Sequence, residues 1–133
     1  MAVLVDTGVW LSGLAVAAQA ALPLPHRFFD PPPIVCHLHR GLGGAIRRAR
    51  TRLPGGGENP VAVIRIPRER MIGYGIASSL VHEVGHQAAA LLGLLESLRP
   101  ALQEAQQRAP EEHRPAWSLY ERWVSEVLAD FWA

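Results

Sequence analysis

The chain has 133 residues, of which 49% are hydrophobic and 19% charged, and its formal net charge is +1. This length suits one globular domain, and the composition excludes a collagen-like chain, a disulfide-dense miniprotein and a wholly disordered polymer. The balanced charge argues against a dedicated nucleic-acid binder, which carries a larger basic excess. The only cysteine, Cys36, allows no intramolecular disulfide, so a cytoplasmic location is favoured over secretion.

An uncharged, apolar segment runs from Thr7 to Leu24. We expect a buried helix over residues 7–22, capped by Asp6 or Thr7 and stopped by Pro23. Two alternatives stay open, because the segment is also long enough for a secretion signal or for a helix that contacts a membrane or a protein partner. Secretion signals begin with positive residues, and this segment is preceded by an aspartate and no arginine.

The next stretch of the chain alternates Pro- and Gly-rich runs with short apolar ones. Residues 23–33 are Pro-rich and predict an extended linker, whereas residues 34–38 predict a strand. Residues 41–53 predict a short basic helix, and the Gly-rich residues 54–60 predict a loop. Residues 61–66 are rich in β-branched side chains and lie between two prolines, so they predict a strand at the edge of a sheet.

The longest helix is expected from residue 75 or 76 to Leu98, because apolar residues recur there every three or four positions and Pro100 follows. A polar connector with a weak helical tendency is expected over residues 101–113, and Pro115 then opens a last helix. That helix reaches the end of the sequence without a Gly or Pro cap, so a complete domain and a fragment of a longer protein both remain open.

Within the long helix, residues 82–86 read His-Glu-Val-Gly-His, which is the H-E-x-x-H pattern. Residues four apart lie one turn above each other on one helix face, so both imidazoles can bind the same metal ion. Glu83 is adjacent to them and is placed to accept a proton from water, whose pKa zinc lowers to about 7. Gly85 in a helix interior indicates that another backbone or a cofactor approaches closely. The pattern favours metal-assisted hydrolysis over two unrelated histidines.

A catalytic zinc site needs a third protein ligand. The metzincin pattern requires glycine and histidine at two downstream positions where this chain has Ala89 and Leu92, so that class is excluded. Glu126 and Asp130 lie one turn apart on the last expected helix, so one can bind the metal while the other accepts a hydrogen bond from a ligating histidine. Weaker candidates for the third ligand are Glu96, Glu111 and Glu112.

H-E-x-x-H followed by a helical E-x-x-x-D resembles the gluzincin class of zinc metallopeptidases, and a chain this short is similar to its minimal members, the minigluzincins. The resemblance covers roughly residues 61–131 and implies that His82, His86 and Glu126 bind zinc. It also implies that Glu83 is the general base and that Asp130 orients a histidine ligand. In that class the edge strand pairs with an extended substrate. The residues so assigned are Val61, Ala62, Val63, Ile64, Arg65 and Ile66.

The nearest candidates for a group that stabilises the oxyanion of the reaction are Tyr120 and His113. Helical spacing turns Tyr120 away from the metal, and His113 lies in a connector, so surface or packing roles are favoured for both. The expected strand also carries Cys36, His37 and His39, for which packing or exposure is favoured over a latency role at the metal.

The tryptophans are expected to be core residues, and one of them, Trp123, is also a candidate wall of the metal site. The four are Trp10, Trp117, Trp123 and Trp132. An aromatic stripe on a terminal helix is also consistent with a partner-binding or membrane-binding surface.

The sequence as a whole predicts an α+β fold in which a small sheet packs on a long active-site helix and a second helix supplies Glu126. Residues 1–33 are expected to form an N-terminal helix and linker, and residues 34–133 a zincin-like metallopeptidase domain. We expect zinc-dependent hydrolysis of peptide bonds in a peptide or protein substrate, with no nucleic-acid partner. The alternatives are a non-enzymatic zincin-like module that binds a partner, and a membrane-associated protease anchored by residues 7–24.

Overall fold

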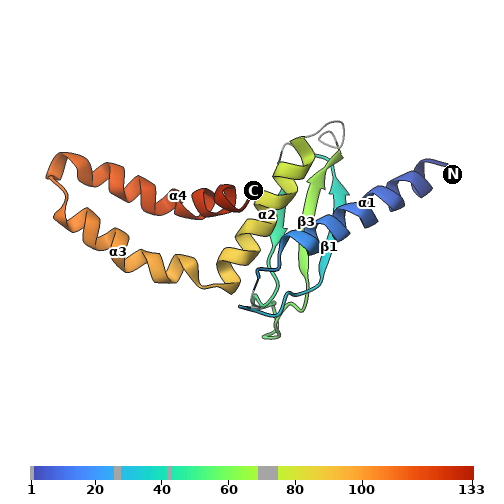
Figure 1. Cartoon of the computed structure of the whole chain (residues 1–133), viewed down its shortest axis with the longest axis horizontal. Coiled ribbons are helices and arrows are strands. Elements are labelled where there is room, and N and C mark those ends of the chain that lie inside the picture. The colour runs from blue at the N-terminus through green and yellow to red at the C-terminus, as the bar shows by residue number, and fades with distance from the viewer. Residues whose placement is uncertain (1, 26–27, 42, 69–74) are drawn as a thin grey trace.

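The computed structural model describes residues 2–25, 28–41, 43–68 and 75–133 and has an α+β fold (Figure 1). The described part contains four α-helices and a three-stranded mixed sheet, which confirms the predicted α+β class. In chain order the elements are α1 (Ala2–Ala21), β1 (Ile34–His39), β2 (Ala45–Arg47), β3 (Ala62–Pro67), α2 (Gly75–Leu91), α3 (Leu94–Arg108), the short 3-10 helix η2 (Glu111–His113) and α4 (Arg114–Trp132).

The apolar N-terminal segment forms helix α1, as predicted, although the helix already includes the expected cap residues Asp6 and Thr7. It ends before Pro23. Ala18, near its C-terminal end, is buried in the core, and Leu11 and Leu14 pack against the core partly buried. The N-terminal part extends past the sheet (Figure 1), and Trp10 is 62% exposed, so its predicted core position is wrong. Among the described residues, no helix is both long enough and apolar enough to cross a membrane.

The side chain of Gln19 attaches α1 to the start of β1. Its Nε2 donates to the carbonyl oxygen of Pro32 at 3.2 Å, and its Oε1 accepts from the amide of Ile34 at 2.9 Å. β1 confirms the strand predicted at residues 34–38, and Cys36 on it is buried in the core. Packing is therefore the role of this thiol, away from the metal-binding candidates.

Strand β3 lies in the centre of the sheet, in the order β1-β3-β2, so the prediction of an edge strand at residues 61–66 is wrong. It pairs parallel to β1 along its whole length and antiparallel to β2 at Val63–Arg65. The flanking prolines do not require an edge, because Pro60 precedes the strand and Pro67 is its last residue. Neither therefore removes a hydrogen bond from the middle of the ladder.

The second edge strand, β2, arises from residues 41–53, where the predicted basic helix is wrong. Glycines at 41, 43 and 44 each weaken a helix by about 1 kcal/mol relative to alanine, whereas Ala45–Arg47 gains backbone hydrogen bonds by pairing with β3. β2 consequently forms an edge of the sheet beside α2. The loop predicted at residues 54–60 is confirmed apart from one isolated bridge at Glu58.

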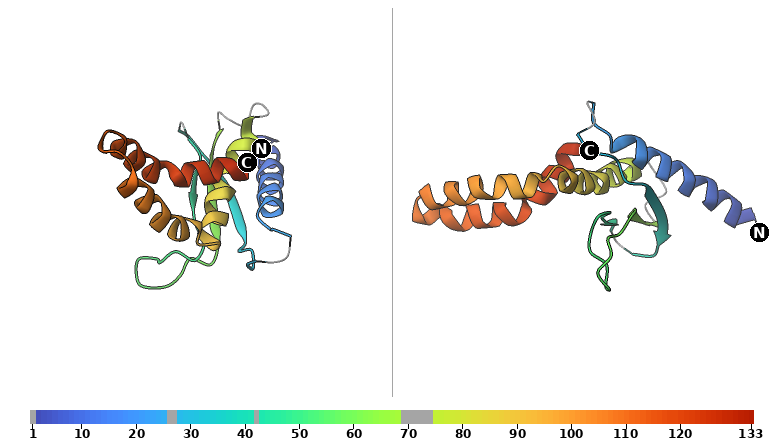
Figure 2. Two further views of the ribbon diagram at one scale, coloured as in Figure 1. Left: turned by 60° about the vertical axis from the view of Figure 1, so that its left-hand side comes forward. Right: turned by 90° about the horizontal axis from the view of Figure 1, so that it is seen from below.

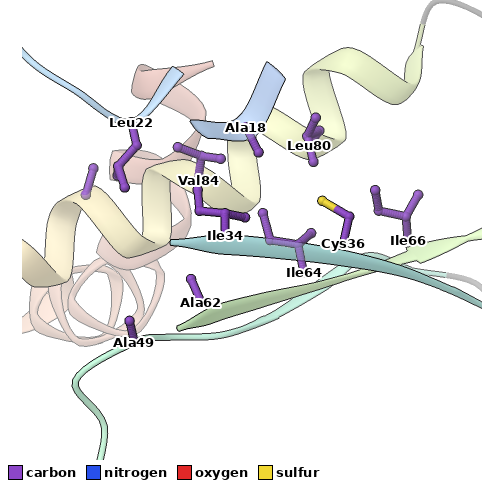
Figure 3. Close-up of a cluster of buried hydrophobic side chains, with 11 residues drawn as sticks. Ala18, Leu22, Ile34, Cys36, Ala49, Ala62, Ile64, Ile66, Leu80 and Val84 are labelled. Carbon is purple, nitrogen blue, oxygen red and sulfur yellow. The ribbon is translucent and has the colours of Figure 1, made fainter. Parts of the chain in front are cut away.

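Helices α1 and α2 cover one face of the sheet, and the hydrophobic core lies between the two layers (Figure 3). Alternate residues of β1 and β3 point into it, as the two-residue period of a strand requires. On α2, Val84 and Ala88 face this core. Because a helix has 3.6 residues per turn, His82 and His86 lie on the opposite side of α2, away from the sheet-facing core.

The helix predicted from residue 75 or 76 to Leu98 is interrupted at Gly93, whose φ of 61° lies in the left-handed region that ends helices. A new helix, α3, then continues through Pro100 to Arg108, beyond the expected stop. Residues 96–100 are exposed, so the carbonyl that proline leaves unpaired can bind water. The polar connector predicted after Pro100 is therefore largely helical.

Helices α3 and α4 form a hairpin that projects from the rest of the molecule and returns the chain to α2 (Figures 1 and 2). α4 begins at Arg114 with Pro115 in its first turn, as predicted. No residue of α3 is buried, and only Val124 and Ala129 are buried on α4. The hairpin is thus attached to the molecule mainly through the C-terminal part of α4.

Candidate metal centre

The two histidines of the H-E-x-x-H pattern lie on one face of α2, as the sequence predicts. Their ring centroids are 4.8 Å apart and the ring planes are perpendicular. The side chains of His82 and His86 are 23% and 20% exposed, so both are accessible from one side only. Helical spacing alone produces this pairing, since one turn separates residues four apart.

Glu126 on α4 completes a group of three potential metal ligands. Its Oε2 lies 3.3 Å from Nε2 of His82 and 3.5 Å from Nε2 of His86. The three ligand atoms lie within 4.8 Å of one another, and this is the only such group of three among the described residues. The structure therefore brings together the three residues that the sequence proposed as metal ligands.

The position of Glu126 depends on the close approach of α4 to α2 at Gly85. A Cβ atom added at Gly85 would lie 2.8 Å from both Cα and the carbonyl oxygen of Ala129. Only glycine leaves room for this backbone contact, as the sequence analysis expected for this position. The indole of Trp132 fixes the same end of α4, because its Nε1 donates to the carbonyl of Ala21 at 3.0 Å.

Asp130 lies one turn beyond Glu126 and contacts the other nitrogen of His82. Its Oδ1 is 2.7 Å from Nδ1 of that imidazole. An ionised carboxylate only accepts hydrogen bonds, so Nδ1 carries the hydrogen and the lone pair lies on Nε2. The lone pair of His82 is thereby directed to the side on which Glu126 lies.

Glu83 lies beside this group, half-buried between α2 and the start of β2. The pKa of its carboxyl is raised, and burial is the largest cause. The negative charge of Glu126 also raises this pKa, whereas the positive charges of Arg65 and of a protonated His82 lower it. A Cβ added at Gly44 would lie 2.9 Å from Oε1 of Glu83, so the backbone before β2 passes directly against this carboxylate. The direction of the pKa shift favours a carboxylate that can hold and release a proton.

The environment of His86 favours its neutral form. Burial is the largest cause that lowers the pKa of His86, and Glu126 raises it. The charge of Arg48 lowers it further, as does that of His82 when its imidazole is protonated. A metal-binding imidazole must offer a free lone pair, so the neutral form is the one that can bind.

Two cavities flank the candidate ligands. One, of about 330 Å³, lies on the Asp130 side, and the other, of about 600 Å³, lies on the Glu126 side. His82, Glu83 and Gly44 line both cavities, so Glu83 stands between them. The larger cavity is also lined by Ala45 and Ile46 of β2.

β2 is thus the strand that lines the larger cavity, whereas β3 reaches Glu83 only at a small cavity of about 10 Å³. Sequence reasoning assigned this place to residues 61–66, but β3 has a neighbouring strand on both sides. The signal that could have identified β2 is the glycine pair at 43 and 44, because glycine before a short apolar run marks a close backbone approach.

Several other residues considered from the sequence lie outside the site. Glu96, Glu111 and Glu112 do not belong to the candidate ligand group. Tyr120 and His113 line a separate cavity with Trp117 and Ala116. Trp123 is 61% exposed, so its predicted core position is wrong, and it lines neither cavity beside the ligands. The remaining two tryptophans, Trp117 and Trp132, are half-buried.

Comparisons with protein-family models, with curated proteins and with solved structures found no match to this chain.

Proposed function

We propose that this chain is a zinc-dependent metallopeptidase of the gluzincin type with a zincin-like fold. The observation that carries the proposal is the convergence of His82, His86 and Glu126 from two helices that are distant in sequence. Two imidazole nitrogens and one carboxylate oxygen form a donor set that catalytic zinc uses with a fourth position left for substrate.

Two separations between candidate ligand atoms are compatible with zinc, and all three atoms lie within 4.8 Å of one another. Tetrahedral zinc with bonds of about 2.0–2.1 Å holds neighbouring ligand atoms about 3.3–3.4 Å apart. Oε2 of Glu126 lies 3.3 Å and 3.5 Å from the two imidazole nitrogens. The hydrogen bond from His82 to Asp130 supplies the outer contact that orients a ligating imidazole.

When bound, zinc would act as a Lewis acid that polarises the scissile carbonyl and lowers the pKa of water. Glu83 would take the proton from the attacking water and deliver it to the leaving amine. Its half-buried position favours this exchange, because burial raises the pKa of its carboxyl toward working pH. Its place between the two cavities allows the substrate to extend to either side of the reacting carbonyl.

An extended substrate would pair with the outer edge of β2. Ala45 and Ile46 line the larger cavity, and the strand has β3 on one side only. Backbone hydrogen bonds to such an edge bind peptides with little dependence on sequence. The role that the sequence analysis gave to residues 61–66 therefore passes to β2 in this proposal.

The chain has a second candidate function as a non-enzymatic, metal-holding module that binds a protein partner. Large apolar side chains are exposed along α4, where Trp123 is 61% and Phe131 is 90% exposed. Exposed apolar patches on a folded protein are typical of interaction surfaces. In this alternative, metal binding would stabilise the hairpin and Glu83 would have no chemical role.

Replacement of Glu83 by glutamine distinguishes the two candidates. We expect Glu83→Gln to bind zinc as the wild type does and to cleave a mixed peptide library about 10²–10⁴-fold more slowly, because only the proton acceptor is lost. Zinc is measured by elemental analysis of protein purified without a metal-affinity tag, and cleavage by mass spectrometry. Glu96→Gln, at an exposed site outside the ligand group, is the control and should keep both properties.

Other outcomes would contradict the peptidase. Undiminished cleavage by Glu83→Gln would remove the proposed mechanism. A wild-type protein that binds no zinc from micromolar solution would exclude the zinc enzyme. Zinc binding without cleavage by the wild type would favour the partner-binding module.

A further inference from the structure

The two cavities beside the candidate ligands differ in charge. Among the residues that the structure describes, the smaller one is lined by Asp130 and by the serines at 78 and 79, and His82 is its one basic residue. The larger one is lined by Arg48 together with His86 and Glu126. Within the described part of the chain, the guanidinium that lines these two cavities is that of Arg48, on the Glu126 side.

Hydrogen bonds hold the backbone at Arg48 in a fixed position relative to α2. The next amide, that of Ala49, donates to Oε1 of the buried Gln87 at 2.8 Å, and Gln87 directly follows His86. The carbonyl of Arg48 accepts from Oγ1 of Thr51 at 2.7 Å and from Nδ2 of Asn59 at 3.3 Å. The guanidinium is thus carried by a backbone that is attached to the active-site helix itself.

Arg48 is an exposed residue that lines the larger cavity. Within residues 2–25, 28–41, 43–68 and 75–133, none of the ion pairs includes Arg48. Its side chain nevertheless reaches the site, because it lines the same cavity as His86 and Glu126. An arginine at a cavity wall with free donors binds carboxylates well, since its planar fork matches their two oxygens.

We propose that Arg48 selects peptide substrates that place a carboxylate in the cavity on the Glu126 side. This inference rests on the proposed peptidase function and adds the substrate class. The carboxylate can come from an Asp or Glu side chain or from the C-terminus of the peptide. Leu95 in the same cavity offers an apolar wall to the remainder of the side chain.

The test uses eight-residue fluorescent peptides in which one Glu is moved along an otherwise neutral sequence, with Gln and Lys at the same position as counterparts. Each is made with a free and with an amidated C-terminus, which separates a side-chain carboxylate from a terminal one. Binding is measured by anisotropy on the full chain carrying Glu83→Gln, with and without zinc, and cleavage is measured on the wild type.

We expect the peptide with Glu at one particular position, or the peptide with a free C-terminus, to bind about five- to tenfold better than its neutral counterpart and to be cleaved faster by the same factor. One charge-assisted pair at a solvent-accessible site accounts for a difference of this size. Arg48→Gln should remove this preference and Arg48→Glu should reverse it toward Lys. Arg47→Glu is the control, because Arg47 is exposed, pairs with Val63 in the sheet and lines neither cavity.

The two assays separate this inference from the proposed function. Cleavage without an acidic preference, or a preference unchanged in Arg48→Gln, would overturn the role of Arg48 and leave the peptidase intact. Arg48-dependent binding of acidic peptides without cleavage would support the role of Arg48 and contradict the peptidase. Equal binding of Glu, Gln and Lys peptides in the absence of cleavage would overturn both.

Discussion

Nδ1 of His82 lies 2.7 Å from Oδ1 of Asp130, a hydrogen bond that joins residues 48 positions apart on two different helices. The contact determines which imidazole nitrogen offers its lone pair, and it also ties α4 to α2 beside Glu126. One hydrogen bond therefore couples the tautomer of a candidate ligand to the position of the helix that carries another.

Loss of this contact should weaken metal binding. We expect Asp130→Ala to lower zinc affinity about 10–100-fold, because the imidazole of His82 is then free to rotate and to change tautomer. Asp130→Asn should have a smaller effect, since its amide oxygen still accepts the hydrogen bond. Competition with a chelator of known affinity measures the change. Asp30→Asn, in an exposed loop, is the control, and equal affinities in Asp130→Ala and wild type would contradict the orienting role.

The contact between Gly85 and Ala129 predicts the opposite of the usual effect of Gly→Ala in a helix. Alanine is favoured over glycine in a helix interior by about 1 kcal/mol. At Gly85 the new methyl would lie 2.8 Å from backbone atoms of Ala129, so α4 must move, at a cost typical of overpacking of about 1–3 kcal/mol. We expect Gly85→Ala to lower the free energy of unfolding, measured in urea, and to weaken zinc binding.

Gly13→Ala is the matched control for this prediction. Gly13 lies in α1 with nothing within 4 Å of an added Cβ, so the substitution should stabilise the protein by up to about 1 kcal/mol. If Gly85→Ala were as stable as Gly13→Ala, the close approach of α2 and α4 at Gly85 would not determine the position of α4.

The candidate metal ligands could be predicted from the sequence because spacing on a helix determines which residues share a face. His82 and His86 needed only that α2 be helical, and Glu126 and Asp130 only that α4 be helical. The ligand-bearing faces of α2 and α4 meet because of long-range packing, which helical spacing does not reveal. The local signal for this close approach is the glycine at position 85.

The strand order could not be predicted in the same way. The composition of residues 61–66 indicates a strand but not its neighbours, and the prolines at its ends are compatible with either an edge or the centre. β2 has only three residues, so it has almost no local signal, and it forms because β3 is available to pair with it. The strand that borders the site was consequently missed.

The exposed tryptophans show a similar limit. Trp10 and Trp123 lie on helices whose outer parts extend beyond the sheet or project as a hairpin (Figure 2). Whether a side chain is buried depends on which element lies opposite, and helical periodicity gives only the face on which it lies.

The buried thiol of Cys36 predicts a loss of stability in alkaline solution. Burial raises the pKa of Cys36 from 9.0 to about 11, so the folded protein holds the thiol proton more tightly than the unfolded chain does. The contribution of the protonated thiol to the free energy of unfolding is therefore complete below pH about 9 and is lost progressively as the pH rises toward 11. We expect the urea midpoint of the wild type to fall relative to that of Cys36→Ala across this range.

Alkylation gives an independent measurement of the same property. The thiolate is the reactive form, so iodoacetamide should modify the folded protein slowly at pH 8 and rapidly after unfolding in urea. A constant difference between the two urea midpoints from pH 8.5 to 11, or fast alkylation of the folded protein, would show that Cys36 is not protected by the core.

Gly44 predicts a variant that separates metal binding from hydrolysis. A methyl group at this position would lie 2.9 Å from Oε1 of Glu83, which is the far end of a flexible side chain. We expect Gly44→Ala to fold and to bind zinc normally, because Glu83 can move aside. Cleavage should nevertheless fall about 10²-fold, as it does when a reacting group is misplaced by about 1 Å. Gly43→Ala, next to it with nothing within 4 Å, should retain full cleavage. Equal cleavage by the two variants would mean that the position of Glu83 against β2 has no part in the reaction.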